Sequence, residues 1–440
     1  GHARPAFINL QQYYVEGYLA ERAAELSNLD IRWMHKVKAI SQTDDATLLT
    51  VETTEGGYTL QAQYVVACDG SRSTVRQLMG LETTGRVFQD RFLIADVKMA
   101  AEFPTERWFW FDPPFHPNQS VLLHRQPDHV WRIDFQLGWD ADPEEEKKPE
   151  KIIPRVKALL AYGVKNKDVS PEFTLEWASV YTFACQRMTS FRHGRVLFAG
   201  DSAHGVSPFG ARGANSGIQD AENLAWKLDA VLRNQAPDAL LNSYASEREY
   251  AADENICNST RATDFISPKS DISRLFRDAV LDLAKDHPFA RTLVNSGRLS
   301  VPATLHDSVL NTPDEDAFAG RMVPGSVALD APVQLVDGSE GWLLSQLGAG
   351  FSLMVYGGDL STVLPCNVVN IQAQHAAASA VSANALIDKD GLIARRYDMQ
   401  AGTAYLLRPD QHVCARWRQL TPAKLQTALD LALSKNASKN

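Results

Sequence analysis

The sequence has few cysteines, and they are not grouped. Five cysteines are scattered over 440 residues, and no two of them form a C-x-x-C pair. They are Cys68, Cys185, Cys257, Cys366 and Cys414. This distribution excludes a zinc ribbon and a dense disulfide framework, so no metal site is expected. It is typical of a protein that works in a reducing compartment.

The sequence also lacks long apolar runs. It contains no stretch of about 18 apolar residues and no basic segment followed by an apolar leader. The formal net charge of −9 and the pI near 5.7 predict an acidic surface, which repels nucleic acid and anionic membranes. We therefore expect a cytoplasmic protein that acts on small molecules, without a nucleic-acid or membrane partner.

Hydrophobic periodicity gives a coarse map of the chain. A helix is predicted from Leu10 to Leu26, and a charged loop from Asp140 to Glu150. Apolar and polar residues alternate from Trp131 to Leu137, which predicts a strand with one polar face. Arg132 and Asp134 lie on that face, where they could meet a substrate carboxylate.

Two short segments carry residues suited to ligand binding. The first begins with the apolar run Val-Val-Ala, a pattern typical of a strand buried on both faces. Asp69 and Gly70 follow, where a polar contact and a close backbone approach to a ligand are expected. Arg72 and Arg76 could then face phosphate. Alternatively, Asp69 caps the following helix, with Ser73 as a second cap; both interpretations stay open.

The second segment repeats this design. A buried strand ends in Gly200 and Asp201, and a loop with Gly210 and Gly213 precedes a helix that opens near Asn215. A helix N-terminus offers free N–H groups and partial positive charge, which would stabilise an electron-accepting ring. The alternative is a tight loop whose glycines serve geometry only. The expected buried stripe of the helix consists of Ile218, Ala221, Leu224, Ala225, Leu228, Val231 and Leu232.

Together the segments resemble two motifs of the class A flavoprotein monooxygenases, which are FAD-dependent aromatic hydroxylases. The first motif is Asp-Gly-x-x-Ser-x-x-Arg at Asp69–Arg76. The second comprises Gly200-Asp201-x-Ala203-His204, Pro208, Gly213, Asn215, Gly217, Asp220, Asn223-Leu224 and Trp226-Lys227-Leu228. The order and separation of the motifs also match. The chain looks most like the 3-(3-hydroxyphenyl)propionate hydroxylase and phenol hydroxylase type.

This resemblance implies a mixed α/β fold. A Rossmann-like FAD/NAD(P)-binding domain would span residues 1–90 and 191–265, with a β-sheet substrate domain inserted at 91–190. A helical connection at 266–320 would lead to a thioredoxin-like domain at 321–440, without the usual C-x-x-C. The family's G-x-G-x-x-G unit is not found in the sequence. We therefore expect an incomplete FAD domain with an exposed apolar sheet edge, in a truncated hydroxylase or a chain that has lost FAD affinity.

The resemblance also implies roles for particular residues. Asp201 would hydrogen-bond the ribityl chain of FAD, and Pro208 would lie against the ring near the oxygen-reacting face. Backbone N–H groups would meet the N1–C2 side of the isoalloxazine. The cofactor-binding residues would be Gln12, Asp69, Gly70, Gly200, Asp201, Pro208, Gly213, Ala214 and Asn215. His204 is a candidate for acid–base catalysis, although a structural role in holding the loop is favoured. Ala211 departs from the family's usual glycine.

The implied reaction is flavin-centred. NADH or NADPH would reduce FAD, which would activate O2 to hydroxylate a phenolic or other aromatic substrate, as in aromatic catabolism. No catalytic triad is needed, and the enzyme could form a homodimer. Two alternatives remain. The chain could be a flavin-dependent reductase or dehydrogenase that does not use O2, or a non-enzymatic remnant unable to hold FAD.

Overall fold

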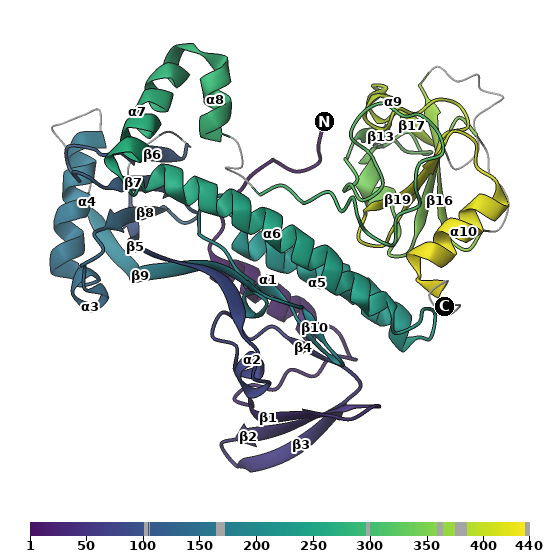
Figure 1. Cartoon of the computed structure of the whole chain (residues 1–440). Helices are drawn as coiled ribbons and strands as arrows, with labels where there is room; N and C mark the ends of the chain where they lie inside the picture. Colours follow the sequence, from purple (N-terminus) through teal and green to yellow (C-terminus); the bar gives the residue numbers. More distant parts are fainter. Residues whose placement is uncertain are drawn as a thin grey trace.

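The computed structural model describes residues 1–100, 104, 106–163, 172–295, 300–358, 364–374 and 385–435. Figure 1 shows two long neighbouring helices, α5 and α6, running between the β-rich first half and a separate C-terminal sheet. These helices are α5 (Gly213–Leu232) and α6 (Leu240–Ile266). The predicted mixed α/β fold is confirmed. No helix within the described ranges combines the length and apolar character that a bilayer crossing requires.

A small parallel sheet carries both motif segments. Its order is β10-β11-β4, and β11 and β4 pair in parallel. Its strands are β4 (Val65–Ala67), β10 (Arg192–His193) and β11 (Val196–Phe198). The sheet packs on α6, where the Tyr244 hydroxyl donates to the Phe198 carbonyl at 2.6 Å. β4 lies at the edge of this sheet with Val66 38% exposed, so the expected burial of the strand on both faces was wrong.

Three further elements belong to the first 80 residues. An antiparallel meander comprises β1 (Lys36–Gln42), β2 (Thr47–Thr53) and β3 (Gly56–Ala62). Two helices precede and follow the first motif strand: α1 (Gln12–Ala24), within the predicted range, and α2 (Thr74–Leu78).

The largest sheet of the first half has six strands, in the order β12-β9-β5-β8-β7-β6. Its strands are β5 (Thr83–Met99), β6 (Trp108–Phe111), β7 (Ser120–Arg125), β8 (Val130–Leu137), β9 (Phe173–Met188) and β12 (His204–Gly205). The predicted alternation in β8 is confirmed, because Trp131, Ile133, Phe135 and Leu137 are all buried. They pack with α4 (Pro149–Gly163), which covers this face (Figure 1).

The predicted loop from Asp140 to Glu150 is only partly irregular. The short helix α3 (Pro143–Glu146) lies inside it, and α4 already begins at Pro149. Asp142 caps α3 by accepting from the Glu144 N–H, and Pro143 occupies the first turn, where its missing N–H costs nothing. The prediction was wrong here because proline and acidic residues suit helix N-termini as well as loops. Two helices after α6, α7 (Asp271–Asp286) and α8 (Pro288–Asn295), precede the C-terminal sheet.

The C-terminal sheet has the order β14-β13-β17-β16-β15-β18-β19. Its strands are β13 (Pro332–Gln334), β14 (Glu340–Trp342), β15 (Ser352–Tyr356), β16 (Asn367–Ala373), β17 (Leu386–Asp388), β18 (Ala404–Leu407) and β19 (Val413–Trp417). Parallel β15 and β16 lie beside the antiparallel pair β18 and β19. Helix α9 (Leu392–Tyr397) follows β17, and α10 (Pro422–Ala432) follows β19.

A buried ion cluster joins this sheet region to α5 and α6. The Arg408 guanidinium donates to Glu247 at 2.6 Å and to Asp410 at 2.6 Å, and Lys227 Nζ lies 2.7 Å from Glu247. All four side chains are at most 1% exposed. Burial opposes ionisation of Glu247, yet Arg408 and Lys227 hold its pKa well below the usual range. The C-terminal region is therefore docked on the helix that follows the second motif.

Candidate functional site

The two motif loops meet at one edge of the parallel sheet. Because β4 and β11 run in parallel, their carboxyl ends lie side by side, as expected for a ligand site in an open α/β sheet. The Ala199 N–H donates to the Ala67 carbonyl at 3.1 Å, and the Ser202 hydroxyl donates to the same carbonyl at 2.6 Å. The two motif loops therefore contact each other and form a single local site.

The first loop is held mainly by contacts within the protein. Asp69 accepts from the Val75 N–H at 2.9 Å, and Ser73 accepts from the Arg76 N–H at 3.0 Å, so both residues cap α2. Gly70 has a φ of 78°, in the left-handed region that favours glycine. The capping interpretation of Asp69 is thus supported by contacts, while its support of the cofactor stays a prediction.

Arg76 corrects the phosphate interpretation. Its side chain is buried, and its guanidinium donates to the carbonyls of Ser71 and Ser202, both at 2.6 Å. Arg76 therefore ties the first loop to the second and is unavailable to phosphate. Arg72, in contrast, is exposed.

The second loop turns sharply at Gly200. The residue has φ 63°, in the left-handed region that favours glycine, and its N–H donates to the Asp220 carboxylate at 2.9 Å. A Cβ placed on Gly217 of α5 would lie 3.5 Å from the Gly200 Cα, so this turn packs closely against the helix. Asp201 is consequently presented on the exposed side of the turn.

His204 is buried and contacts other residues of the protein. Its ring is 2% exposed and stacks on Phe191 with centroids 5.5 Å apart, and its Nε2 lies 2.7 Å from Asp220. Asp220 also accepts from Arg248 Nε at 2.6 Å. Burial opposes ionisation of Asp220, but His204 and Arg248 hold its pKa below the ordinary value. These contacts favour the loop-holding role over acid–base catalysis.

The loop before α5 leads into a helix start whose backbone N–H groups are free to bind a ligand. Pro208 is exposed, and Gly210 and Ala211 both have positive φ, 93° and 54°. Helix α5 begins at Gly213. In the described part of the chain, its first three N–H groups, at residues 213–215, have no hydrogen-bond acceptor, as is general for a helix start. Ala211 therefore keeps the loop shape that glycine would adopt more easily.

The expected apolar stripe of α5 was wrong in part. Leu224 is buried, but Ile218 is 59% exposed and Leu232 is 45% exposed. The buried stripe instead contains Ser216, Asp220, Asn223 and Lys227, which are spaced by three or four residues. Partners on α6 make this possible, among them Glu247 and Arg248.

The remaining predicted residues lie apart from the two loops. Gln12 is exposed on α1 and donates to Glu16 at 2.6 Å, whereas its neighbour Gln11 is buried. Arg132 and Asp134 belong to the six-stranded sheet, and Arg132 makes a bidentate ion pair with Asp96 at 2.8 Å. The structure thus brings together Asp69, Gly70, Gly200, Asp201 and His204, and α5 contacts them through Gly217 and Asp220.

Sequence reasoning did not predict that Asp220 accepts hydrogen bonds from three residues, namely Gly200, His204 and Arg248. The residue was recognised only as part of a motif, without a role. A usable signal is its spacing, because Ser216, Asp220, Asn223 and Lys227 form a polar series inside an apolar helix. The partner Arg248 on α6 gave no such signal, since charged residues on a long helix usually face solvent.

The accessible groups fit the ring and ribityl end of FAD. Asp201, Pro208, Ala214 and Asn215 are all exposed, and the free N–H groups at residues 213–215 accompany them. These are the donors that a flavin carbonyl edge requires. Within the described residues, no group of three or more His, Cys, Asp and Glu could hold a metal ion.

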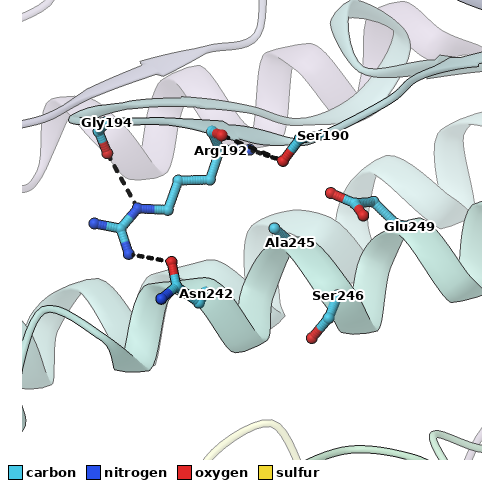
Figure 2. Close-up of a pocket in the computed structure, with 7 residues that line it drawn as sticks. All are labelled: Ser190, Arg192, Gly194, Asn242, Ala245, Ser246 and Glu249. Carbon is cyan, nitrogen blue, oxygen red and sulfur yellow. Dashed lines mark hydrogen bonds between the residues drawn. The ribbon is translucent and has the colours of Figure 1, made fainter.

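An open cavity of about 490 Å³ lies elsewhere, between the β10 turn and α6. Figure 2 shows that Arg192, which lines this cavity, is already hydrogen-bonded to Asn242 and to the Gly194 carbonyl. Glu249 accepts from the Phe191 N–H at 2.8 Å. None of the predicted site residues lines this cavity.

The fold is that of flavin-dependent monooxygenases. The chain aligns with the flavin-dependent monooxygenase PieE with a TM-score of 0.75 and 18% identity, covering 96% of this chain and 79% of that one. For the anhydrotetracycline hydroxylase OxyS of Streptomyces rimosus, the TM-score is 0.64, the identity 26%, and the coverage 96% and 79%.

The chain belongs to the FAD-binding domain family, whose model matches residues 2–259. It is 28% identical to a 3-(3-hydroxy-phenyl)propionate/3-hydroxycinnamic acid hydroxylase of Mycolicibacterium smegmatis, over 80% of this chain and 60% of the relative. It is 36% identical to a probable NADH-specific resorcinol 4-hydroxylase of Rhodococcus jostii, over 56% of this chain and 44% of the relative. The chain thus spans less than two thirds of these relatives, and the predicted family is confirmed.

Proposed function

We propose that the protein is an FAD-dependent monooxygenase that hydroxylates a phenolic or other aromatic compound, with NADH or NADPH and O2 as co-substrates. The main support for this proposal is the arrangement at the carboxyl ends of the parallel strands β4 and β11. There, hydrogen bonds connect the two motif loops beside the start of α5. The relatives, which include hydroxylases of aromatic compounds, support this proposal.

The residues at this edge would divide the work of holding FAD. Asp201 would accept hydrogen bonds from the ribityl hydroxyls, and N–H groups at residues 213–215 would donate to the carbonyl edge of the ring. Pro208 would lie against the ring, while Asp69, Gly70, Gly200 and Gln12 would support the cofactor. Bound FAD supplies the electron transfer and oxygen activation. The protein would contribute position, donors and exclusion of water.

We also propose a cytoplasmic location. All five cysteines are free thiols in the structure, which suits a reducing compartment. We further propose the domain boundaries that the sequence predicts, including a thioredoxin-like domain that begins at residue 321. The order of β15, β16, β18 and β19 supports that unit.

The test is flavin binding followed by coupled turnover. We expect the purified chain to bind FAD, with a visible flavin spectrum perturbed by the protein. We expect an aromatic substrate to accelerate NAD(P)H consumption and to yield a hydroxylated product containing oxygen from O2. NAD(P)H oxidation without O2 dependence would instead identify a reductase. A chain that is folded but does not bind FAD would contradict the proposal.

A further inference from the structure

Helix α7 carries a series of apolar side chains on a face that is open to solvent. The series recurs at intervals of three or four residues, the spacing that places side chains on one face of a helix. An amphipathic helix of a globular protein normally buries such a face, yet every member of this series is exposed. The members, together called the outer stripe, are Ile272, Leu275, Phe276, Ala279 and Leu283.

A different face anchors α7 to the rest of the protein. Arg277 and Val280 are its buried residues, and the Arg277 guanidinium lies over the ring of Phe111 on β6, 5.4 Å from the centroid. Arg274 also donates to the Asn118 side chain at 3.2 Å. The helix is therefore docked on the end of the six-stranded sheet without the use of its outer stripe.

Helix α8 adds two more exposed apolar residues. It folds back on the end of α7, where the Arg291 guanidinium donates to two backbone carbonyls at 2.8 Å. Ala290 is buried, but Phe289 and Leu293, which are one turn apart, are exposed. Figure 1 shows this pair of helices at the end of the molecule where β6 and β7 lie. The outer stripe and these two residues are called the α7–α8 face.

The extent of the α7–α8 face is close to one side of a stable protein–protein interface. Its large side chains are exposed by 80% at Ile272, 71% at Leu275, 60% at Phe276, 44% at Leu283, 64% at Phe289 and 55% at Leu293. At about 200 Å² for each large side chain, they present roughly 700 Å² to solvent. A specific dimer buries about 800 Å² on each partner, whereas the largest apolar patch of a monomer is about 300–600 Å².

The charges around the face indicate which partner fits it. Residues 271–295 contain four aspartates and four arginines or lysines, so this segment is neutral although the whole chain carries a net charge of −9. Asp278 and Asp282 are each paired with a cation of their own helix, Arg277 and Lys285, at 2.8 and 2.7 Å. Two copies of a neutral face do not repel each other, so this part of the acidic chain is suited to self-association.

An anionic membrane fits the same charges poorly. Helices that lie on such membranes have a polar face rich in lysine and arginine, and tryptophan is common on their apolar face. Half of the charged residues at positions 271–295 are acidic, and the segment contains no tryptophan. The α7–α8 face is therefore better matched to protein than to lipid.

We propose that the α7–α8 face is the interface of a symmetric homodimer, in which it packs against the same face of a second copy. In a twofold dimer each contact occurs twice, so an apolar and neutral surface can serve as its own partner. Arg277 and Phe111 connect α7 to β6, so the dimer interface lies at the end of the six-stranded sheet. This inference goes beyond the proposed function, because it concerns a surface that holds none of the residues assigned to FAD.

The experiment is sedimentation equilibrium of the full chain from about 1 to about 100 µM, with and without added FAD. We expect a reversible monomer–dimer equilibrium with a dissociation constant of about 10 µM or tighter, since interfaces of this size usually reach micromolar affinity or better. FAD should leave this constant unchanged within about threefold.

Two variants test whether the α7–α8 face forms the interface. Phe276→Ser removes an aromatic ring from both copies, and each ring contributes about tenfold or more when it is buried, so the dimer should weaken at least about 100-fold. Ile272→Ser, in the first turn of α7, should weaken it at least about tenfold. Val336→Ser is the matched control, because Val336 is 62% exposed in the C-terminal region. It should leave the dimer unchanged.

The folding of the variants is checked by thermal melting. All three substituted side chains are exposed, so each variant should melt within about 2 °C of the wild type. Phe276→Ser should also retain FAD affinity and any hydroxylation activity of the wild type. If the wild type dimerises as described but shows no hydroxylation, the dimer stands and the monooxygenase proposal fails.

Three results would overturn the dimer. The first is a wild type that stays monomeric at about 100 µM. The second is a dimer that Phe276→Ser and Ile272→Ser both leave intact, because its interface would then lie elsewhere. The third is a monomer that binds vesicles of phosphatidylcholine and phosphatidylglycerol and loses this binding in Phe276→Ser, which would assign the face to lipid.

Discussion

Asp220 offers the sharpest test of how the cofactor loop is held. This fully buried carboxylate accepts from the Gly200 N–H, from His204 and from Arg248, at 2.9, 2.7 and 2.6 Å. In Asp220→Asn, one carbonyl oxygen must replace two carboxylate oxygens, and the buried Arg248 loses its counter-ion. Removing one partner of a buried ion pair costs about 3–5 kcal/mol. We expect a loss of that size in the free energy of unfolding.

The assay is urea unfolding followed by tryptophan fluorescence, with FAD affinity measured on the folded variant. Asp229→Asn is a matched control on the same helix. The Asp229 carboxylate pairs with Arg233 at 2.7 Å, but both side chains are more than half exposed, so its loss costs about 0.5 kcal/mol or less. We expect weaker FAD binding only in Asp220→Asn, because only that variant frees the Gly200 turn. A loss within 1 kcal/mol of the control would refute the reasoning.

Three more changes test the rest of the structure. Arg408→Met leaves the buried Asp410 without its arginine and leaves Glu247 with Lys227 alone, so the free energy of unfolding should fall by about 3–5 kcal/mol; unchanged denaturation midpoints would contradict the docked C-terminal region. Ala211→Gly relieves a positive φ of 54° and should stabilise the protein by about 1 kcal/mol, read as a raised melting temperature. Asp220 has a lowered pKa, so its contribution is present above about pH 4 and is lost on further acidification. Acid titration of the wild type and Asp220→Asn should therefore converge at low pH.

The sequence predicted those parts of the site that depend on strand ends. The apolar runs at Val65–Ala67 and Val196–Phe198 were correctly interpreted as strands, although only the second is buried throughout, and parallel pairing then brings their following loops together. Alternation in Trp131–Leu137 likewise identified the faces of β8. These patterns are local, since a strand's side chains alternate whatever its neighbours are.

The errors arose where a partner far along the chain decides the outcome. Arg76 was a candidate for a phosphate contact, but its guanidinium donates to the carbonyl of Ser202, which lies 126 residues away in the sequence. Helix α5 was expected to bury apolar residues, but Glu247 and Arg248 on α6 make Lys227 and Asp220 acceptable inside. A hydrophobicity pattern assigns polar residues to solvent because it contains no information about such partners.

The central claim is that the Gly200-Asp201 turn and the start of α5 hold the ring end of FAD. It is tested most directly by titrating FAD fluorescence with the wild type and with Asp201→Ala, using Asp229→Ala as the exposed control on α5. We predict saturable quenching by the wild type and the control, and at least about tenfold weaker binding by Asp201→Ala, since charged hydrogen bonds contribute about 1.5–3 kcal/mol. Equal binding by all three proteins, or no binding by the folded wild type, would contradict the claim.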